Sequence, residues 1–121
     1  MDPAELDQPM MSFSLPEEIS KVLADKRTTN VKHAAVLAKN EHVRIVLAVL
    51  SRGEMLHEHQ TDGQIVISVV SGAIRFNTPG NHVDLTAGGF LTLHPGIRHS
   101  VHALEDCAFV ITVCAVPKMV P

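Results

Sequence analysis

The chain has few aromatic residues and no excess of positive charge. It contains no tryptophan or tyrosine and only 4 phenylalanines, so it offers no stacking platform for nucleic-acid bases. Its formal net charge is −3, and its lysines and arginines are dispersed along the sequence. Binding to nucleic acid or to an anionic membrane requires a basic stripe that releases counterions. We therefore expect no nucleic-acid partner and no membrane partner, and a small molecule instead.

The sequence also lacks a long apolar run and a targeting signal. No apolar stretch approaches the roughly 20 residues that a transmembrane helix needs. The N-terminal segment carries Asp2, Glu5 and Asp7 in place of the basic region and apolar segment of a secretory or organellar signal. From these absences we expect a cytoplasmic protein.

Cysteine is scarce as well, with 2 residues in the chain. Cys107 and Cys114 belong to one expected strand and have opposite parity, which places their side chains on opposite faces. They are therefore poorly placed to form a disulfide with each other, and we expect reduced thiols in the core. A reactive cysteine requires a cationic neighbour or a helix N-terminus, and the sequence shows neither beside them.

The length and composition suit a single domain with a short N-terminal extension. A chain of 121 residues with 45% hydrophobic content is large enough to bury its own core. Residues 1–13 are polar and aperiodic, and we expect a flexible N-terminal arm there. Its apolar residues Met10, Met11 and Phe13 can pack across a partner subunit. Residues 14–121 then form the domain.

A short helix is expected at the start of this domain. The segment Ser14-Leu15-Pro16-Glu17 has the composition of a capping box, in which Ser14 and Glu17 each bond the backbone amide of the other. Apolar residues continue at helical spacing as far as about Asp25. They form one stripe that must cover another element: Leu15, Ile19, Val22 and Leu23.

From Val31 onward the hydrophobic pattern changes to a period of two, which is typical of β-strands. Turn sequences such as Asp62-Gly63 and Pro95-Gly96 separate the segments. Eight or nine short strands are expected, over 31–38, 42–51, 54–59, 64–71, 73–77, 81–85, 90–93, 99–104 and 107–116. Because no helix separates them, they predict an all-β fold, either an antiparallel sandwich or a small barrel.

Four residues have the spacing of a metal site: His57, His59, Gln64 and His99. The first two alternate on one expected strand, so both imidazoles point to the same face. Gln64 follows an Asp-Gly turn that can return the chain alongside His59, and His99 begins a later strand after a Pro-Gly turn. The alternative interpretation is that the paired histidines are polar residues on a solvated strand and that His99 satisfies a local backbone bond.

These residues resemble the two sequence motifs of the cupin family. The first cupin motif runs from a glycine through H-x-H and a Glu or Gln to another glycine, and its counterparts here are Gly53, His57, His59, Gln64 and Gly72. The second motif combines a glycine with P-x-G-x-x-H, and its counterparts are Gly88 and residues 94–99. The resemblance covers residues 44–116. It implies a cupin-type jelly-roll β-barrel, also called a double-stranded β-helix, which follows the short N-terminal helix.

Three departures from the cupin pattern affect the expected chemistry. Gln64 replaces the usual glutamate, the motif proline is shifted to Pro95, and Ala103 replaces the distal asparagine. An amide lacks the attraction of a carboxylate for a cation, which is about 4 kcal/mol for two unit charges 4 Å apart at an effective dielectric constant of 20. The ion is therefore held less tightly, keeps its full charge and retains open positions for water or substrate.

The ligand set narrows the choice of metal and of function. Three neutral imidazoles suit a divalent iron or zinc ion, with nickel, manganese and copper as alternatives, because histidine selects weakly among them. The resemblance implies a non-haem metal-dependent dioxygenase acting on a small apolar or aromatic molecule. In that function His94 is a candidate acid, base or substrate contact. The alternative is a non-catalytic cupin module that binds or senses a small molecule. The resemblance also implies a homodimer, since cupins commonly pair through strands or N-terminal segments.

Overall fold

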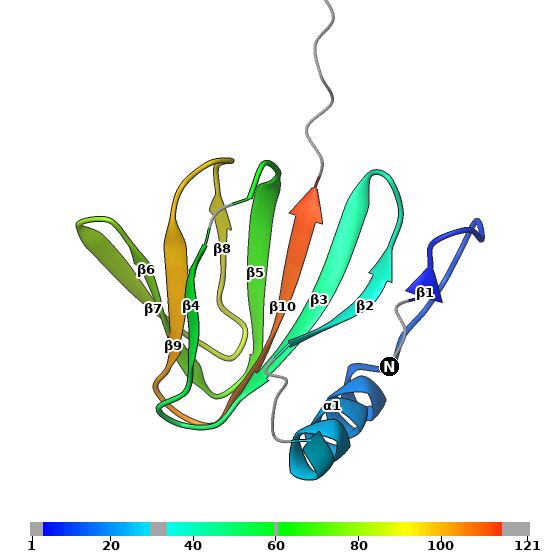
Figure 1. Cartoon of the computed structure of the whole chain (residues 1–121), viewed down its shortest axis with the longest axis horizontal. Helices are drawn as coiled ribbons and strands as arrows, with labels where there is room; N and C mark the ends of the chain where they lie inside the picture. The colour runs from blue at the N-terminus through cyan, green and yellow to red at the C-terminus, as the bar shows by residue number, and fades with distance from the viewer. Residues whose placement is uncertain (1–3, 30–33, 60, 115–121) are drawn as a thin grey trace, which may run out of the picture.

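Two β-sheets face each other in the structure, a computed structural model that describes residues 4–29, 34–59 and 61–114 (Figure 1). The side chains of residues 26–29, 58 and 59 lie outside that description. In spatial order, the 6-stranded sheet contains β1 (Ala4–Glu5), β2 (Ala34–Lys39), β3 (Val43–Leu50), β10 (Cys107–Cys114), β5 (Gln64–Ser71) and β8 (Phe90–Leu93). The 4-stranded sheet contains β4 (Met55–His59), β9 (His99–Ala103), β6 (Ala73–Thr78) and β7 (Asn81–Thr86).

The all-β fold predicted from the sequence is confirmed. Every strand expected from the period-two pattern is present, within a few residues of its expected bounds. The expected ends at 31–33 and 115–116 lie outside the described residues. Apart from the parallel pair β1 and β2, the strand pairs in the described ranges are antiparallel. This pairing brings strands that are distant in sequence side by side, so that β10 lies between β3 and β5.

The N-terminal segment contributes an edge strand that the sequence did not predict. Ala4 pairs with Ala38 of β2, and the amide of Leu6 donates to the carbonyl of Lys39 at 3.0 Å. Part of the expected arm at residues 1–13 is therefore bonded to the sheet of its own chain. A strand of 2 residues has no periodicity that a sequence pattern could reveal. The flexibility of the rest of the arm stays a prediction.

Helix α1 (Leu15–Thr29) begins where the capping sequence predicts. The amide of Glu18 donates to the carbonyl of Ser14 at 3.0 Å, and the acidic residues of the first turn complement the helix dipole. The helix continues beyond the end expected at Asp25, because the following Lys26 and Arg27 favour helix although they extend no apolar stripe. No helix in the described part of the chain is long and apolar enough to cross a membrane.

Side chains from alternate positions of the sheets fill two separate cores. On β3, Ala48 and Leu50 point between the two sheets, whereas Leu47 and Val49 point outward to α1. The buried apolar residues of the inner core lie between the sheets, and the buried ring of His99 stacks on one of them, Phe76. They are Ala48, Leu50, Ile65, Ile67, Val69, Ile74, Phe76, Val101, Ala103, Cys107 and Phe109. The outer core is covered by the stripe predicted on the helix: Leu15, Ile19, Val22 and Leu23. Burial on both faces fixes the strand register, because a slip of one residue would exchange the two cores.

Cys107 has the predicted position in the core, whereas Cys114 does not belong to either core. Cys107 is buried in the inner core and Cys114 is partly buried, and neither forms a disulfide. Their positions at opposite ends of β10 agree with the parity argument, since a strand of 8 residues separates the two sulfur atoms along its length.

Candidate functional site

Two of the predicted metal ligands lie at one end of the space between the sheets. β4 ends at His59 and β9 begins at His99, and the two residues are partners in the antiparallel register. A backbone bond from the amide of Gly96 to the carbonyl of Thr61, 2.8 Å long, joins the turn before β9 to the loop after β4. The local turn sequences and the sheet register therefore bring together residues that are 40 positions apart in the chain. The His59 side chain itself lies outside the described residues.

The ring of His99 is buried and is held by a contact with the backbone. Its side chain is 3% exposed, and among the described residues it is the buried one with a polar side chain. Its Nδ1 lies 2.9 Å from the carbonyl oxygen of Ile97. A carbonyl oxygen only accepts, so Nδ1 carries the proton and Nε2 carries the lone pair of the neutral ring. Metal-binding histidines usually have their second ring nitrogen fixed in this way.

The same contacts also fit the alternative interpretation of His99. The bond to Ile97 satisfies one ring nitrogen, and the ring stacks on the apolar ring of Phe76, so part of the histidine is satisfied without an ion. The metal role of His99 consequently stays a prediction. The structure adds that Nδ1 is the ring nitrogen that contacts Ile97, which the sequence could not reveal.

His57 lies beside an irregularity in β4 that the sequence did not predict. Leu56 pairs with Val101 and His59 pairs with His99, so three steps along β4 match two steps along β9. Such a bulge breaks the simple alternation of side chains between the two faces. Leu56 packs against the inner core, and the following His57 is exposed. Alternation alone therefore does not place His57 and His59 of β4 on the same face.

Gln64 lies on the outer face of β5. Its neighbour Ile65 is buried in the inner core, and Gln64 has the opposite parity. The amide Nε2 of Gln64 donates to Thr92 Oγ1 at 2.6 Å, and Thr92 is an exposed residue of β8. The structure thus does not bring Gln64 to the inner face beside His99. At the beginning of β5, the residue that faces inward is Ile65, a position that strand parity in the sequence could have identified.

Two further histidines, His94 of the second motif and His102 after it, have different surroundings. His94 is exposed and follows the last residue of β8, so its proposed contact with a substrate stays a prediction. His102 lies on the outer face of β9, opposite Arg75 in the register, as its odd spacing from His99 predicts. In the ranges that the structure describes, no three His, Cys, Asp or Glu residues are grouped to hold a metal ion. The expected group includes His59, so its complete geometry stays untested.

The outer face of the 4-stranded sheet carries a charge pair. Arg75 Nε donates to Asp84 Oδ1 at 2.8 Å, and Arg75 Nη2 donates to Asp84 Oδ2 at 3.0 Å. The hydrogen bond and the positive charge of Arg75 lower the pKa of Asp84 below its ordinary value. The same bond raises the pKa of Arg75. Both side chains face solvent, and Arg75 is bonded to Asp84 there, so it does not anchor a ligand between the sheets.

Comparison with known proteins identifies the family. A model of the AraC-like ligand-binding domain matches residues 45–114, which begin in β3 and end with β10. The chain belongs to this family. The matched segment contains all four predicted metal ligands and all the buried apolar residues of the inner core. No curated protein sequence matches the chain.

Several solved structures share the fold. A cupin superfamily protein from Desulfitobacterium hafniense has a TM-score of 0.66 at 17% identity, over 69% of this chain and 76% of that chain. A conserved protein of unknown function from Streptococcus pyogenes has a TM-score of 0.70 at 14% identity, over 98% of both chains. An RmlC-like cupin with a double-stranded β-helix fold from Methanocaldococcus jannaschii has a TM-score of 0.67 at 15% identity, over 91% of this chain and 93% of that chain. These similarities confirm the predicted cupin fold.

Proposed function

We propose that this AraC-like domain binds a small molecule at the end of the barrel where His99 lies, beside a divalent metal ion held by His57, His59 and His99. The observation that carries the proposal is the buried imidazole of His99, whose Nδ1 is bonded to the carbonyl of Ile97. A fixed proton on Nδ1 directs the lone pair of Nε2 away from the backbone. The family match to a ligand-binding domain supports the small-molecule part of the proposal.

The other two ligands come from β4. The backbone register pairs His59 with His99, and paired positions of an antiparallel ladder have Cβ atoms about 5 Å apart, which suits two imidazoles on one ion. His57 supplies the third nitrogen in this proposal. It precedes His59 by two residues on β4 and lies on the surface beside the bulge, at the same end of the strand.

The proposed centre has neutral ligands only. Gln64 is bonded to Thr92 on the outer face, and the inward position next to it is occupied by Ile65. An ion held by three imidazoles keeps its double positive charge and favours a ligand with an anionic or oxygen-bearing end. Iron or zinc suits this set best, and nickel, manganese or copper are alternatives.

The body of the ligand is expected to be apolar. The buried apolar residues between the sheets are aliphatic residues, Cys107 and two phenylalanines, and among the described residues the buried one with a polar side chain is His99. A site with one polar end and an apolar wall selects a small molecule with matching character. We therefore expect a small apolar or aromatic compound that carries one oxygen-bearing group.

A dioxygenase is the second candidate function. The observation that favours it is the placement of Gln64, because a centre without a side-chain oxygen ligand leaves coordination positions for a substrate. An iron ion would supply the redox chemistry, while His99 and the apolar wall would orient the substrate. Oxygen consumption by iron-loaded protein with a panel of aromatic and diketone compounds distinguishes the candidates. Saturable binding without oxygen consumption supports the binding domain.

The experiment that tests the metal proposal is a calorimetric titration of metal-free protein with Zn²⁺. We expect one ion per chain and weaker binding at lower pH, because protons compete with the ion for imidazole nitrogens. His57→Ala and His59→Ala should each weaken binding by at least about tenfold. His82→Ala removes an exposed histidine of β7 and serves as the matched control. Equal binding by all four proteins would contradict the proposed centre.

We also propose that the chain forms a homodimer in the cytoplasm through its N-terminal segment. Met10 is 88% exposed and Phe13 is 38% exposed, and both lie between the edge strand β1 and helix α1. Large apolar side chains at a sheet edge are suited to contact with a second copy. Sedimentation equilibrium should give twice the mass of one chain, and Met10→Ser with Phe13→Ser should lower it. A wild-type mass equal to one chain would contradict the dimer.

A further inference from the structure

A pocket lies outside the space between the sheets. Its volume is about 240 Å³, and it is partly open to solvent. It is located where β3 ends and β10 begins, whereas the proposed metal site is located where β4 ends and β9 begins. Because Cys107 at the start of β10 pairs with Leu50 and Cys114 at its end pairs with Gln64, the two sites lie at opposite ends of the fold.

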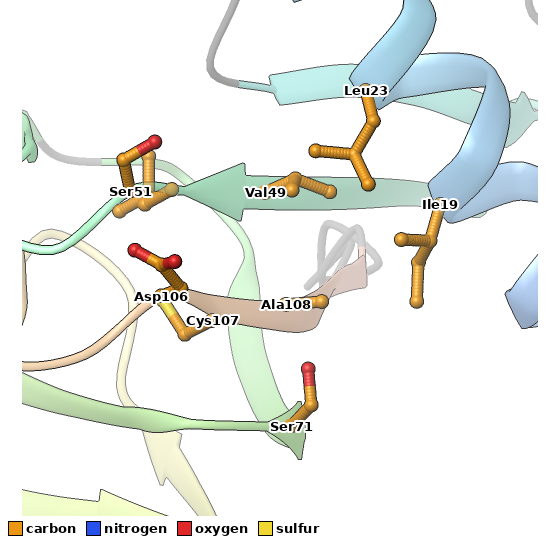
Figure 2. A pocket seen from close by; sticks show the side chains of 9 residues that line it. Ile19, Leu23, Val49, Ser51, Ser71, Asp106, Cys107 and Ala108 are labelled. Atoms are coloured by element: carbon orange, nitrogen blue, oxygen red, sulfur yellow. The ribbon is translucent and has the colours of Figure 1, made fainter.

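The inner part of this pocket is apolar. Ile19 and Leu23 of α1 form one side, and Val49 of β3 and Ala108 of β10 form the floor (Figure 2). All four side chains belong to the outer core, so the pocket lies next to the contact between the helix and the sheet. A molecule placed there would remove apolar surface from water on both sides.

The mouth of the pocket is polar and negatively charged. Ser51, Ser71 and Asp106 lie across the pocket from the helix residues in Figure 2. Asp106 is the one charged side chain among the lining residues. Its Oδ1 accepts a hydrogen bond from the backbone amide of Arg52 at 2.8 Å, which holds the carboxylate beside the mouth. A carboxylate has more lone pairs than this bond uses, so it can accept a further donor.

We infer that this pocket binds a small organic cation, an ammonium group attached to an apolar body. The charge of Asp106 selects a cation for the mouth, and the apolar floor selects the body. An apolar cavity of about 150 Å³ holds benzene, so a pocket of about 240 Å³ accommodates a ring with a short aminoalkyl tail. The site is independent of the proposed metal centre, and its occupation requires no metal ion.

The test is a titration with 2-phenylethylammonium, followed by the amide NMR signals of isotopically labelled protein. We expect saturable shifts of Ser51, Ser71 and Ala108 with a dissociation constant on the order of 1 mM, as for a weak ligand of this size. The neutral analogue 2-phenylethanol should bind about tenfold more weakly, because it lacks the charge that pairs with Asp106.

Matched variants separate the charge from the shape of the pocket. Asp106→Asn keeps an oxygen acceptor for the Arg52 amide, so the loop should persist while cation affinity falls about tenfold and alcohol affinity stays unchanged. Ser71→Leu should fill the mouth and weaken both compounds. Glu105→Gln removes the neighbouring exposed carboxylate, which does not line the pocket, and should change neither affinity.

Three results would overturn the inference. The first is the absence of saturable shifts at the pocket signals up to the solubility limit of the cation. The second is equal affinity for the cation and the alcohol in the wild-type protein. The third is unchanged cation affinity in Asp106→Asn, which would show that the carboxylate makes no contact.

Discussion

The imidazole ring of His99 stacks on the phenyl ring of Phe76, with 5.4 Å between the ring centroids and 16° between the ring planes. The phenyl ring supports one face of the imidazole, and the carbonyl of Ile97 fixes its Nδ1. Both contacts restrict rotation of the ring, so the orientation of Nε2 is determined before any ion binds. A ligand that is preorganised in this way loses little side-chain entropy when it binds.

Phe76→Leu tests this preorganisation. Loss of the stacking contact and of core volume should lower the free energy of unfolding by about 1–2 kcal/mol and weaken Zn²⁺ binding several-fold. Phe109→Leu is the matched control, since Phe109 belongs to the same core on the 6-stranded sheet. It should lower stability similarly and leave Zn²⁺ affinity unchanged. Equal effects of the two substitutions on Zn²⁺ affinity would show that the stacking contact has no role in binding.

Gln64→Ala tests the placement of this residue outside the metal site. The amide bonds Thr92 on the outer face, so its removal should cost about 1 kcal/mol of stability and change Zn²⁺ affinity by less than about twofold. Calorimetric titration and urea denaturation measure the two quantities. A loss of Zn²⁺ affinity comparable to that of His59→Ala would restore Gln64 as a ligand, as the sequence motif predicted.

Gly72→Ala and Gly80→Ala separate the two reasons for glycine at a positive φ angle. Both residues have nearly the same φ, 77° and 76°, which costs an L-residue about 1–2 kcal/mol. A Cβ atom at position 72 would also overlap the carbonyl oxygen of Asp106, whereas position 80 has open space. Gly72→Ala should therefore lose at least about 2 kcal/mol more than Gly80→Ala in urea denaturation. Equal losses would mean that the turn before β6 shifts freely.

The charge pair on β6 and β7 predicts a pH dependence of stability. Because Arg75 lowers the pKa of Asp84 in the folded state, the ionised carboxylate stabilises the fold above the ordinary carboxyl pKa. This contribution is lost as the pH falls through the lowered folded-state pKa. In Arg75→Gln the pKa of Asp84 should return toward its ordinary value, as measured by carbon NMR of the carboxyl group. An unchanged titration midpoint would contradict the assigned cause.

Most of the fold could be predicted from the sequence, because the strands bury apolar side chains at regular positions. Alternation of aliphatic residues defined the strands, and Leu15, Ile19, Val22 and Leu23 defined the face of α1. Strand β1 could not be predicted, since its two residues obtain their conformation from pairing with β2 and not from their own pattern. The exact end of α1 could not be predicted either, because no apolar residue marks it.

The candidate site could be predicted only in part. Spacing and turn chemistry grouped His59 with His99, and the register pairs the backbones of these two residues. The bulge in β4 could not be foreseen, because it depends on how many residues each of two distant strands supplies to their pairing. Gln64 was selected by residue type and motif order. Gln64 and the apolar Ile65 are adjacent in the sequence and therefore face opposite sides of the strand. This alternation indicates the face of Gln64 better than its residue type or motif order does.

The most direct test of the proposed metal centre is elemental analysis of wild-type protein purified without added metal, together with His59→Ala, His99→Gln and the control His82→Ala. We expect close to one iron or zinc ion per chain in the wild type and in His82→Ala, and a large loss in the other two variants. Circular dichroism of each variant verifies that the β fold persists. Metal content that is absent from the folded wild type, or unchanged in His59→Ala and His99→Gln, would contradict the account.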